Sequence, residues 1–206
     1  MLEEQVFDVR RHDRAAFHCG VPALDDYLHK YAAQQNAKGL STVFVIVDDA
    51  SPSKILGFYT LSAAQIDVHQ MSDTERKKLP RYPVPCFRMG RLARAVESRG
   101  GGLGAILIGC AVDRCLHARR LVGAYALLVD AKDEKAKSFY ERYGFISCLD
   151  TPTTLLLTAR LILRNQTNLP PVSLPRKARL GRAALEQADR EVHRQQSVLV
   201  TELLLI

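Results

Sequence analysis

Apolar residues recur at helical spacing near the start of the chain. Four of them fall on one side of a helix: Leu24, Tyr27, Leu28 and Tyr31. Pro22 and a pair of aspartates lie in the first turn, where proline and acidic side chains are favoured, and Gly39 is a typical stop. The pattern predicts an amphipathic helix over residues 21–39.

Residues 41–66 have the composition of β-strands. STVFVIVDD (41–49) and KILGFYTLSAAQI (54–66) are rich in β-branched and aromatic residues, and turn-forming residues separate them. The two runs predict an antiparallel hairpin. After them, SDTERKKLPRYPVP (72–85) predicts a short charged helix and a proline-stiffened loop.

The middle of the chain predicts a βαβ unit. FRMGRLARAV (87–96) is a candidate central strand, GLGAILIGCAVDRCLHARR (102–120) a mostly buried helix, and GAYALLVDA (123–131) the next strand. A second helix is expected in KDEKAKSFYERYG (132–144), followed by strands in FISCL (145–149) and TTLLLTARLIL (153–163). We therefore expect a mixed α/β sheet.

The composition changes after Asn165. NQTNLPPVSLP is typical of a loop, and RKARLGRAALEQADREVHRQQ then predicts a helix before the apolar end SVLVTELLLI. We expect one domain over residues 1–165 and a C-terminal helical extension over 166–206. The extension could dock on the domain, dimerise, or form a ribbon-helix-helix unit that binds DNA, and the sequence leaves these alternatives open.

Charge and cysteine content indicate the kind of partner and the cellular compartment. The formal net charge is +7, with eight Lys+Arg against four Asp+Glu after residue 150, which favours a polyanionic partner. The five cysteines include no CxxC pair, the N-terminus lacks the apolar core of a signal peptide, and no apolar run approaches the ~20 residues of a membrane span. We expect a cytoplasmic protein that makes no membrane contact.

A glycine-rich stretch, RGGGLG (99–104), lies between the predicted central strand and its helix. Glycines in such a turn allow backbone N–H groups to converge on a phosphate, and the positive end of the helix dipole adds to the attraction. The spacing matches neither GxxxxGK[ST] nor GxGxxG. From the hexapeptide alone, a flexible turn is an equal alternative.

Arg99-x-x-Gly102-x-Gly104 resembles the pyrophosphate loop of the GNAT N-acetyltransferases, and SFYERYGF (138–145) is similar to a second stretch of that family. HDRAAFHCGVPALDDYL, GFYTLSAAQI, LPRYPVP and VDAKDEKAKSFYERYGF further resemble the GNAT toxins of bacterial toxin-antitoxin pairs. The resemblance covers roughly residues 6–160. It departs at Gly101, where the subgroup often has arginine, and it has no counterpart for the chain beyond residue 165.

This resemblance implies a GNAT fold, with a mixed, mostly antiparallel sheet flanked by helices, and acetyl-CoA as the cofactor. Tyr140 matches the general acid that protonates the departing thiolate, and Tyr143 is its local competitor. No metal is implied. The residues expected to bind the cofactor are Leu92, Ala93, Arg94, Arg99, Gly100, Gly101, Gly102, Leu103, Gly104, Asp133 and Phe139.

The sequence contains no strong candidate for a general base. At pH 7 a lysine amine is neutral for only about 0.04% of the time, whereas an α-amine is neutral for about 10 to 17%. An enzyme without a dedicated base therefore suits an α-amine, in agreement with toxins of this subgroup, which resemble enzymes that acetylate aminoacyl-tRNA and block translation. Candidates for the tRNA phosphates are Lys77, Lys78, Arg81 and Arg91, with Arg94 nearby, although each could equally lie on a solvated charged face.

The resemblance also implies a cognate ribbon-helix-helix antitoxin and a homodimer. Two other functions remain open at this point: a GNAT enzyme that acetylates a small amine or a protein N-terminus, and a regulatory module that binds through the tail. His12, His18 and His29 have no metal or triad spacing, and Cys110 and Cys115 are expected to fill the core.

Overall fold

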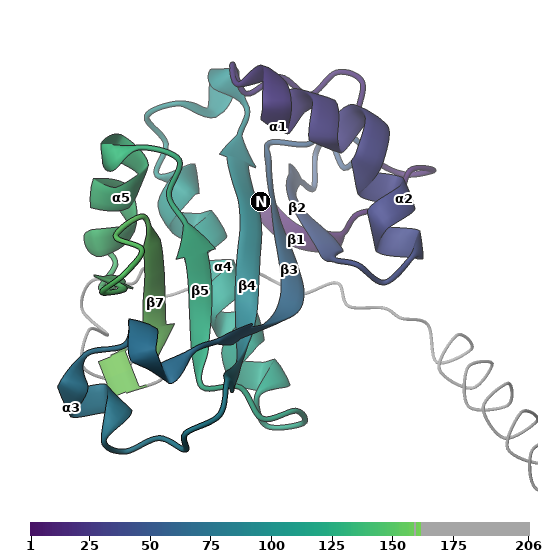
Figure 1. The fold of residues 1–206 in the computed structure, drawn as a ribbon. Coiled ribbons are helices and arrows are strands. Elements are labelled where there is room, and N and C mark those ends of the chain that lie inside the picture. The colour runs from purple at the N-terminus through teal and green to yellow at the C-terminus, as the bar shows by residue number, and fades with distance from the viewer. Residues whose placement is uncertain (159, 162–206) are drawn as a thin grey trace, which may run out of the picture. The chain divides into compact units, whose positions relative to one another are not determined.

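The computed structural model describes residues 1–158, 160 and 161, and their strands form one seven-stranded sheet in the order β1-β2-β3-β4-β5-β7-β6 (Figure 1). Of the neighbouring strands described, β4 and β5 run parallel and the other pairs antiparallel. The predicted mixed, mostly antiparallel sheet is confirmed. The strands are β1 (Leu2–Val6), β2 (Thr42–Asp48), β3 (Gly57–Ile66), β4 (Val84–Arg94), β5 (Ala126–Asp130), β6 (Ile146–Ser147) and β7 (Thr154–Thr158).

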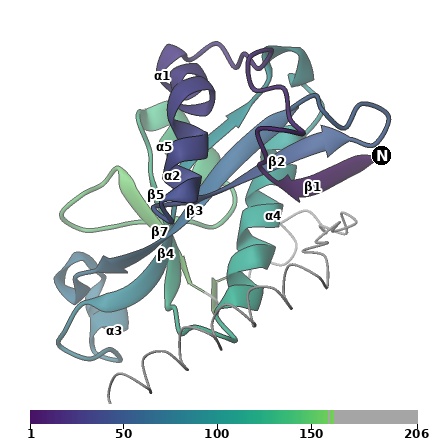
Figure 2. The ribbon, with the colours of Figure 1, turned by 90° about the vertical axis from the view of Figure 1, so that its right-hand side faces the viewer.

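Helices lie on both faces of this sheet (Figure 2). One face is covered by the segment predicted as the first amphipathic helix, and the other by α4, the crossover helix of the predicted βαβ unit. The helices are α1 (Pro22–Asp26), η1 (Tyr27–Tyr31), α2 (Ala32–Ala37), η2 (Val68–Gln70), α3 (Asp73–Arg76), η3 (Val96–Ser98), α4 (Leu103–Ala118) and α5 (Glu134–Glu141).

The first predicted helix is present, but a π turn interrupts it at η1. A π turn takes up more residues than an α turn, so the apolar face rotates within the segment. Tyr27, Leu28 and Ala32 are buried against β2 and β3, whereas Tyr31 is 50% exposed. The expectation that Tyr31 shares the buried face is therefore wrong.

One strand and one strand boundary also differ from the sequence prediction. β1 was not predicted at all, because three of its polar residues, Glu3, Glu4 and Gln5, are buried and hide the usual alternation. The last predicted strand ends at Thr158, whose hydroxyl accepts a hydrogen bond from the backbone N–H of Leu161 at 3.2 Å. The boundary near residue 166 and the C-terminal extension lie outside the described residues.

Within the part of the chain that is described, no helix has the length and apolar content needed to cross a membrane.

Candidate active site

The centre of the sheet opens between β4 and β5. These strands pair only from Phe87 to Met89 of β4, although β4 continues to Arg94 and keeps its pairing with β3 (Figure 1). A β-bulge opposite Thr60 and Leu61 leaves Gly90 without a partner where the two strands separate. The last five residues of β4 therefore have one backbone edge free of strand pairing.

The free edge presents backbone donors at alternate residues. The N–H of Ala95 donates to the carbonyl oxygen of Leu56, on the β3 side, at 2.8 Å. Because successive residues of a strand point their N–H groups to opposite sides, the N–H groups of Leu92 and Arg94 face the opening and that of Ala93 faces β3. Of the three residues predicted to polarise a carbonyl, two can do so with a backbone amide.

A cleft of about 360 Å³ lies at this opening. Eight of the predicted cofactor or catalytic residues line it: Leu92, Ala93, Arg94, Arg99, Gly104, Asp133, Phe139 and Tyr140. Gly100, Gly101 and Gly102 are exposed beside it and are not among its lining residues, and Leu103 is buried in the core under α4. Asp133 has a structural task as well, because its carboxylate caps α5 by accepting the N–H of Ala136 at 2.7 Å.

Two glycines of the loop adopt backbone angles that favour glycine. Gly100 and Gly102 have φ values of +87° and +71°, and Gly102 immediately precedes the first residue of α4. At Gly104, a Cβ atom would lie 3.2 Å from the ring of Phe139 on α5. A side chain here would press on that ring, so glycine eases the close approach of the start of α4 to α5.

Alanine at Gly102 should therefore weaken acetyl-CoA binding, whereas alanine at Gly101 should not. Gly101 has no positive φ, and a Cβ atom there would meet nothing within 4 Å. A non-glycine residue in the left-handed region costs about 1–2 kcal/mol, so Gly102→Ala should raise the Kd about five- to thirtyfold if the strain falls on the binding conformation. Calorimetric titration of both variants tests this, and equal affinities would contradict it.

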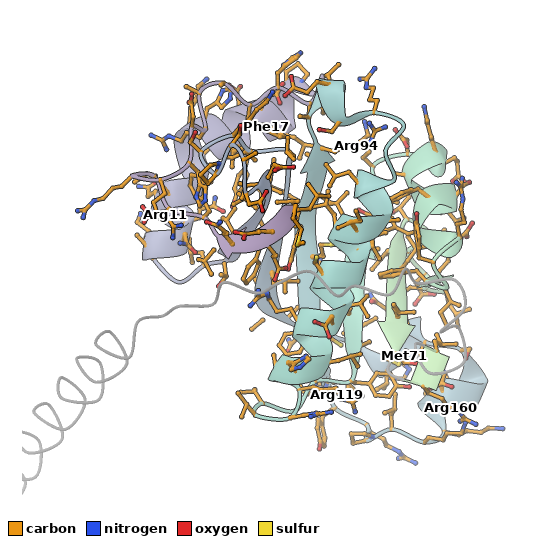
Figure 3. The ribbon with its side chains drawn as sticks, turned by 180° about the vertical axis from the view of Figure 1, so that it is seen from behind. Arg11, Phe17, Met71, Arg94, Arg119 and Arg160 are labelled. Carbon is orange, nitrogen blue, oxygen red and sulfur yellow. The ribbon has the colours of Figure 1, made fainter. Side chains whose placement is uncertain are left out.

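The cleft suits an anionic ligand. Four cationic side chains line it, those of Arg94, Arg99, Lys132 and Lys135, against the one carboxylate of Asp133. The Nη1 atom of Arg94 is buried and has no hydrogen-bond partner among the described residues. A buried donor left unpaired is costly, and an anion in the cleft would satisfy it. These residues fit the pyrophosphate of acetyl-CoA. Figure 3 shows Arg94 at the end of the sheet where Phe17 also lies.

Tyr140 is the phenol of this cleft. Its side chain is 9% exposed and packs against the rings of Phe139 and Phe145, with centroid distances of 5.4 and 5.5 Å. Burial raises the pKa of Tyr140 to about 12, and the negative charge of Asp130 adds to the increase. Tyr143 packs edge-on against Phe139 and is not among the lining residues. The structure thus places Tyr140, and not its competitor, at the opening.

The predicted RNA-binding residues fall in two places. Lys77 and Arg81 line a second pocket, of about 440 Å³, on the loop between α3 and β4, and Lys78 is exposed beside them. His69 and Arg76 line the same pocket. Arg91 lies elsewhere, with its guanidinium 3.7 Å above the ring centre of Tyr27. The structure therefore groups the loop residues and separates Arg91 from them.

Sequence reasoning missed two groups of residues that line the cleft. Cys19, Val21 and Leu24 line it from the segment that leads into α1, and Lys132, Lys135 and Ala136 line it from the start of α5. The second group could have been found, because these residues flank Asp133 in a stretch already singled out. The first group had no local signal, since it lies far from β4 and α5 in the sequence.

The histidines and cysteines have structural surroundings. Nδ1 of His12 accepts a hydrogen bond from the backbone N–H of Asp8 at 3.0 Å, and its Nε2 lies 3.2 Å from the side-chain Oε1 of Gln5. Burial lowers the pKa of His12. His29 lies 2.9 Å from the Phe17 carbonyl oxygen. The five cysteines are buried and form no disulfide, and the described residues include no group of three or more potential metal ligands.

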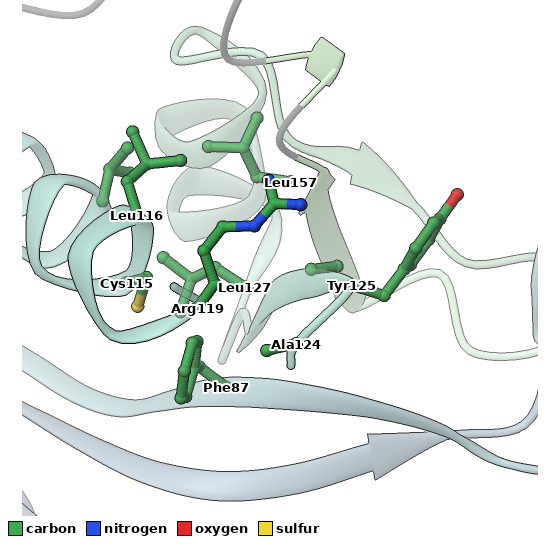
Figure 4. Close-up of a pocket in the computed structure, with 10 residues that line it drawn as sticks. Phe87, Cys115, Leu116, Arg119, Ala124, Tyr125, Leu127 and Leu157 are labelled. Atoms are coloured by element: carbon green, nitrogen blue, oxygen red, sulfur yellow. The ribbon is translucent and has the colours of Figure 1, made fainter. Parts of the chain in front are cut away.

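A small pocket at the C-terminal end of α4 lies away from the cleft (Figure 4). Its wall is mostly apolar, with Arg119 and Tyr125 as its polar members. The hydroxyl of Tyr125 donates a hydrogen bond to Glu75, and Figure 4 shows it directed away from the other lining side chains. We read this pocket as a packing gap and assign no chemistry to it.

Comparison with known proteins agrees with this geometry. No family model matches the chain. The tRNA-acetylating toxin of Mycobacterium tuberculosis is 34% identical over 145 residues, which cover 70% of this chain and 85% of the relative. The probable toxin TacT of Sinorhizobium fredii is 25% identical over 158 residues, with 73% and 87% covered.

Solved structures give the same result. A tyrosine-to-phenylalanine mutant of KacT superposes with a TM-score of 0.74 at 30% identity, covering 79% of this chain and 98% of the other. AtaT complexed with acetyl-methionyl-tRNAfMet superposes with a TM-score of 0.75 at 27% identity, covering 80% of this chain and 98% of the other. AtaTR bound with acetyl-CoA superposes with a TM-score of 0.69 at 28% identity, covering 79% of this chain and 96% of the other. The chain belongs to the GNAT-fold acetyltransferase toxins of toxin-antitoxin systems.

Proposed function

We propose that this protein transfers the acetyl group of acetyl-CoA to the α-amine of an aminoacyl-tRNA and so blocks translation. The observation that carries the proposal is the position of Tyr140 in one cleft with the free edge of β4 and the cationic end of the glycine loop. The substrate class is supported by the relative from M. tuberculosis, named for tRNA acetylation, and by AtaT with acetyl-methionyl-tRNAfMet.

Each part of the cleft has a task in this reaction. Acetyl-CoA supplies a thioester carbonyl as the electrophile. The N–H groups of Leu92 and Arg94 would donate to the carbonyl oxygen as it gains negative charge. Arg94, Arg99 and the N-terminus of α4 would hold the pyrophosphate. Tyr140 would give its proton to the sulfur when the carbon–sulfur bond breaks.

The pH–rate profile should rise once and then stay level. An ordinary α-amine has a pKa of about 7.7–8, and the electron-withdrawing ester of an aminoacyl group lowers it, so the rate increases up to about that range. Because the pKa of Tyr140 is raised to about 12, the acid keeps its proton above the pKa of the amine and no falling limb should follow. Initial rates at pH 6–9.5, corrected for ester hydrolysis, test this, and a decline below pH 9 would contradict the assignment.

We further propose that the loop between α3 and β4 binds tRNA phosphates. Replacing Lys77, Lys78 and Arg81 together with glutamine should raise the KM for charged tRNA about tenfold at physiological salt. The salt dependence of log Kd should become shallower by about two units, since each phosphate contact contributes about 0.7–0.9. Lys38→Gln, on an exposed helix end, is the matched control. An unchanged salt slope in the triple variant would exclude the loop.

The partners follow from the same proposal. A cognate antitoxin of the ribbon-helix-helix type would neutralise the enzyme, the active form would be a homodimer, and a tRNA substrate places the reaction in the cytoplasm. Sedimentation of the purified protein and of its co-expressed antitoxin complex tests the first two statements.

Cell-free translation tests the proposed function as a whole. Adding the protein should stop synthesis when acetyl-CoA is present and leave it unaffected when acetyl-CoA has been removed. Equal synthesis in both reactions would overturn the proposal.

A further inference from the structure

Asp130 is the last residue of β5 and lies where β5 separates from β4. The last pair of the parallel ladder joins Met89 to Val129, one residue earlier. Two neighbouring strands hold the Asp130 side chain. One carboxylate oxygen accepts a hydrogen bond from the guanidinium of Arg88 on β4, and the other accepts the hydroxyl of Thr154 on β7 at 2.9 Å. The carboxylate is thus fixed at the opening of the sheet.

This carboxylate faces away from α4. Side chains alternate along a strand, and Leu127 and Val129 pack in the core cluster under α4, whereas Leu128 belongs to a cluster on the other face. Asp130 shares the orientation of Leu128 and is 47% exposed. Its charge nevertheless reaches Tyr140, whose pKa it helps to raise. Asp130 is not among the residues that line the cleft of Tyr140, but a substrate that enters from the face opposite α4 would meet its carboxylate at the point where β5 leaves β4.

We propose that Asp130 binds the acceptor amine and orients it toward the thioester, a role that rests on the proposed function. A carboxylate oxygen has two lone pairs, so each oxygen of Asp130 can accept one more hydrogen bond. The nitrogen lone pair forms the new bond to the acetyl carbon, and the electrons of the carbon–sulfur bond leave with the sulfur, which takes the Tyr140 proton. The nitrogen gains positive charge meanwhile, and the adjacent carboxylate stabilises that charge until the proton leaves to water.

Arg88 makes this arrangement compatible with a neutral nucleophile. An isolated carboxylate beside an amine would favour the protonated form, which cannot attack the thioester. The guanidinium of Arg88 compensates part of the negative charge while it holds the carboxylate in position. Asp130 can therefore orient the amine with a smaller increase in the pKa of that amine.

The test compares Asp130→Asn with Asp130→Glu and with Asp150→Asn, an exposed carboxylate elsewhere on the chain. We expect Asp130→Asn to lower kcat/KM for aminoacyl-tRNA about 10- to 100-fold, the range of a hydrogen bond to a charged group. Asp130→Glu should recover part of this loss, and Asp150→Asn should match the wild type. The Kd of acetyl-CoA should stay within about twofold in all three.

A tRNA without the amine separates orientation of the amine from a structural role. tRNA acylated with the corresponding des-amino acid offers Asp130 no hydrogen-bond donor at that position, so its inhibition constant should change much less in Asp130→Asn than kcat/KM does. Parallel losses for both acylated tRNAs, or a kcat/KM within twofold of the wild type, would overturn the inference while wild-type activity still supports the proposed function. A wild-type protein that does not acetylate charged tRNA would overturn both.

Discussion

Replacing Tyr140 with phenylalanine is expected to lower the rate of acetyl transfer about 10²- to 10⁴-fold, the usual contribution of general acid–base catalysis. The change removes one hydroxyl and keeps the ring contacts with Phe139 and Phe145. The fold and the affinity for acetyl-CoA should therefore remain within about twofold of the wild type. Initial rates with charged tRNA, together with calorimetric titration of acetyl-CoA, measure the two effects separately.

Tyr143→Phe is the matched control for this variant. Tyr143 contacts the same Phe139 ring, with a centroid distance of 5.2 Å, but it does not line the cleft. It should retain nearly full activity. A large loss in Tyr143→Phe with little loss in Tyr140→Phe would transfer the acid role to Tyr143.

The largest expected effect on stability comes from Glu4→Ala. The Glu4 carboxylate accepts hydrogen bonds from the Tyr59 hydroxyl on β3 and from the guanidinium of Arg114 on α4. Arg114 also lies over the ring of Phe44, 4.0 Å from its centre, and its Nε atom is buried without a hydrogen-bond partner among the described residues. Removing the carboxylate would leave a partly buried cation without its counter-charge and the buried Tyr59 hydroxyl without its acceptor, which should cost about 3 kcal/mol of the free energy of unfolding.

Urea denaturation followed by circular dichroism measures this difference. Glu97→Ala is the comparison, because Glu97 pairs with Lys54 at the surface and both side chains are more than half exposed. Such a pair contributes about 0–1 kcal/mol. Similar losses of unfolding free energy in the two variants would contradict the structural role given to Glu4.

The buried Glu4 carboxylate also explains why one strand of the fold could not be predicted from the sequence. Apolar periodicity and the glycines that end or precede elements predict the hairpin, the βαβ unit with α4, and the helix α5, and all are present. β1 could not be recognised, because Glu3, Glu4 and Gln5 are buried polar residues, and the partners of Glu4, Tyr59 and Arg114, are distant in sequence. Polar residues that become buried only through tertiary contacts leave no local pattern.

The candidate site was predictable to a similar degree. The glycine loop and Tyr140 lie in short stretches that resemble known motifs, and the structure places Arg99, Gly104 and Tyr140 in one cleft. The wall formed by Cys19, Val21 and Leu24 depends on chain folding and has no sequence signature. The bulge at Gly90, which separates β4 from β5, likewise depends on pairing with β3 rather than on residue type alone.

The central claim is that an acetyl group passes through this cleft to the α-amine of a charged tRNA. The most direct measurement incubates the purified protein with isotopically labelled acetyl-CoA and aminoacylated tRNA, digests the RNA with ribonuclease, and analyses the 3′-terminal aminoacyl-adenosine by mass spectrometry. We expect one labelled acetyl group on the aminoacyl nitrogen with the wild type and almost none with Tyr140→Phe. An unmodified aminoacyl-adenosine, with the label on a small amine or a protein N-terminus supplied in the same reaction, would contradict it.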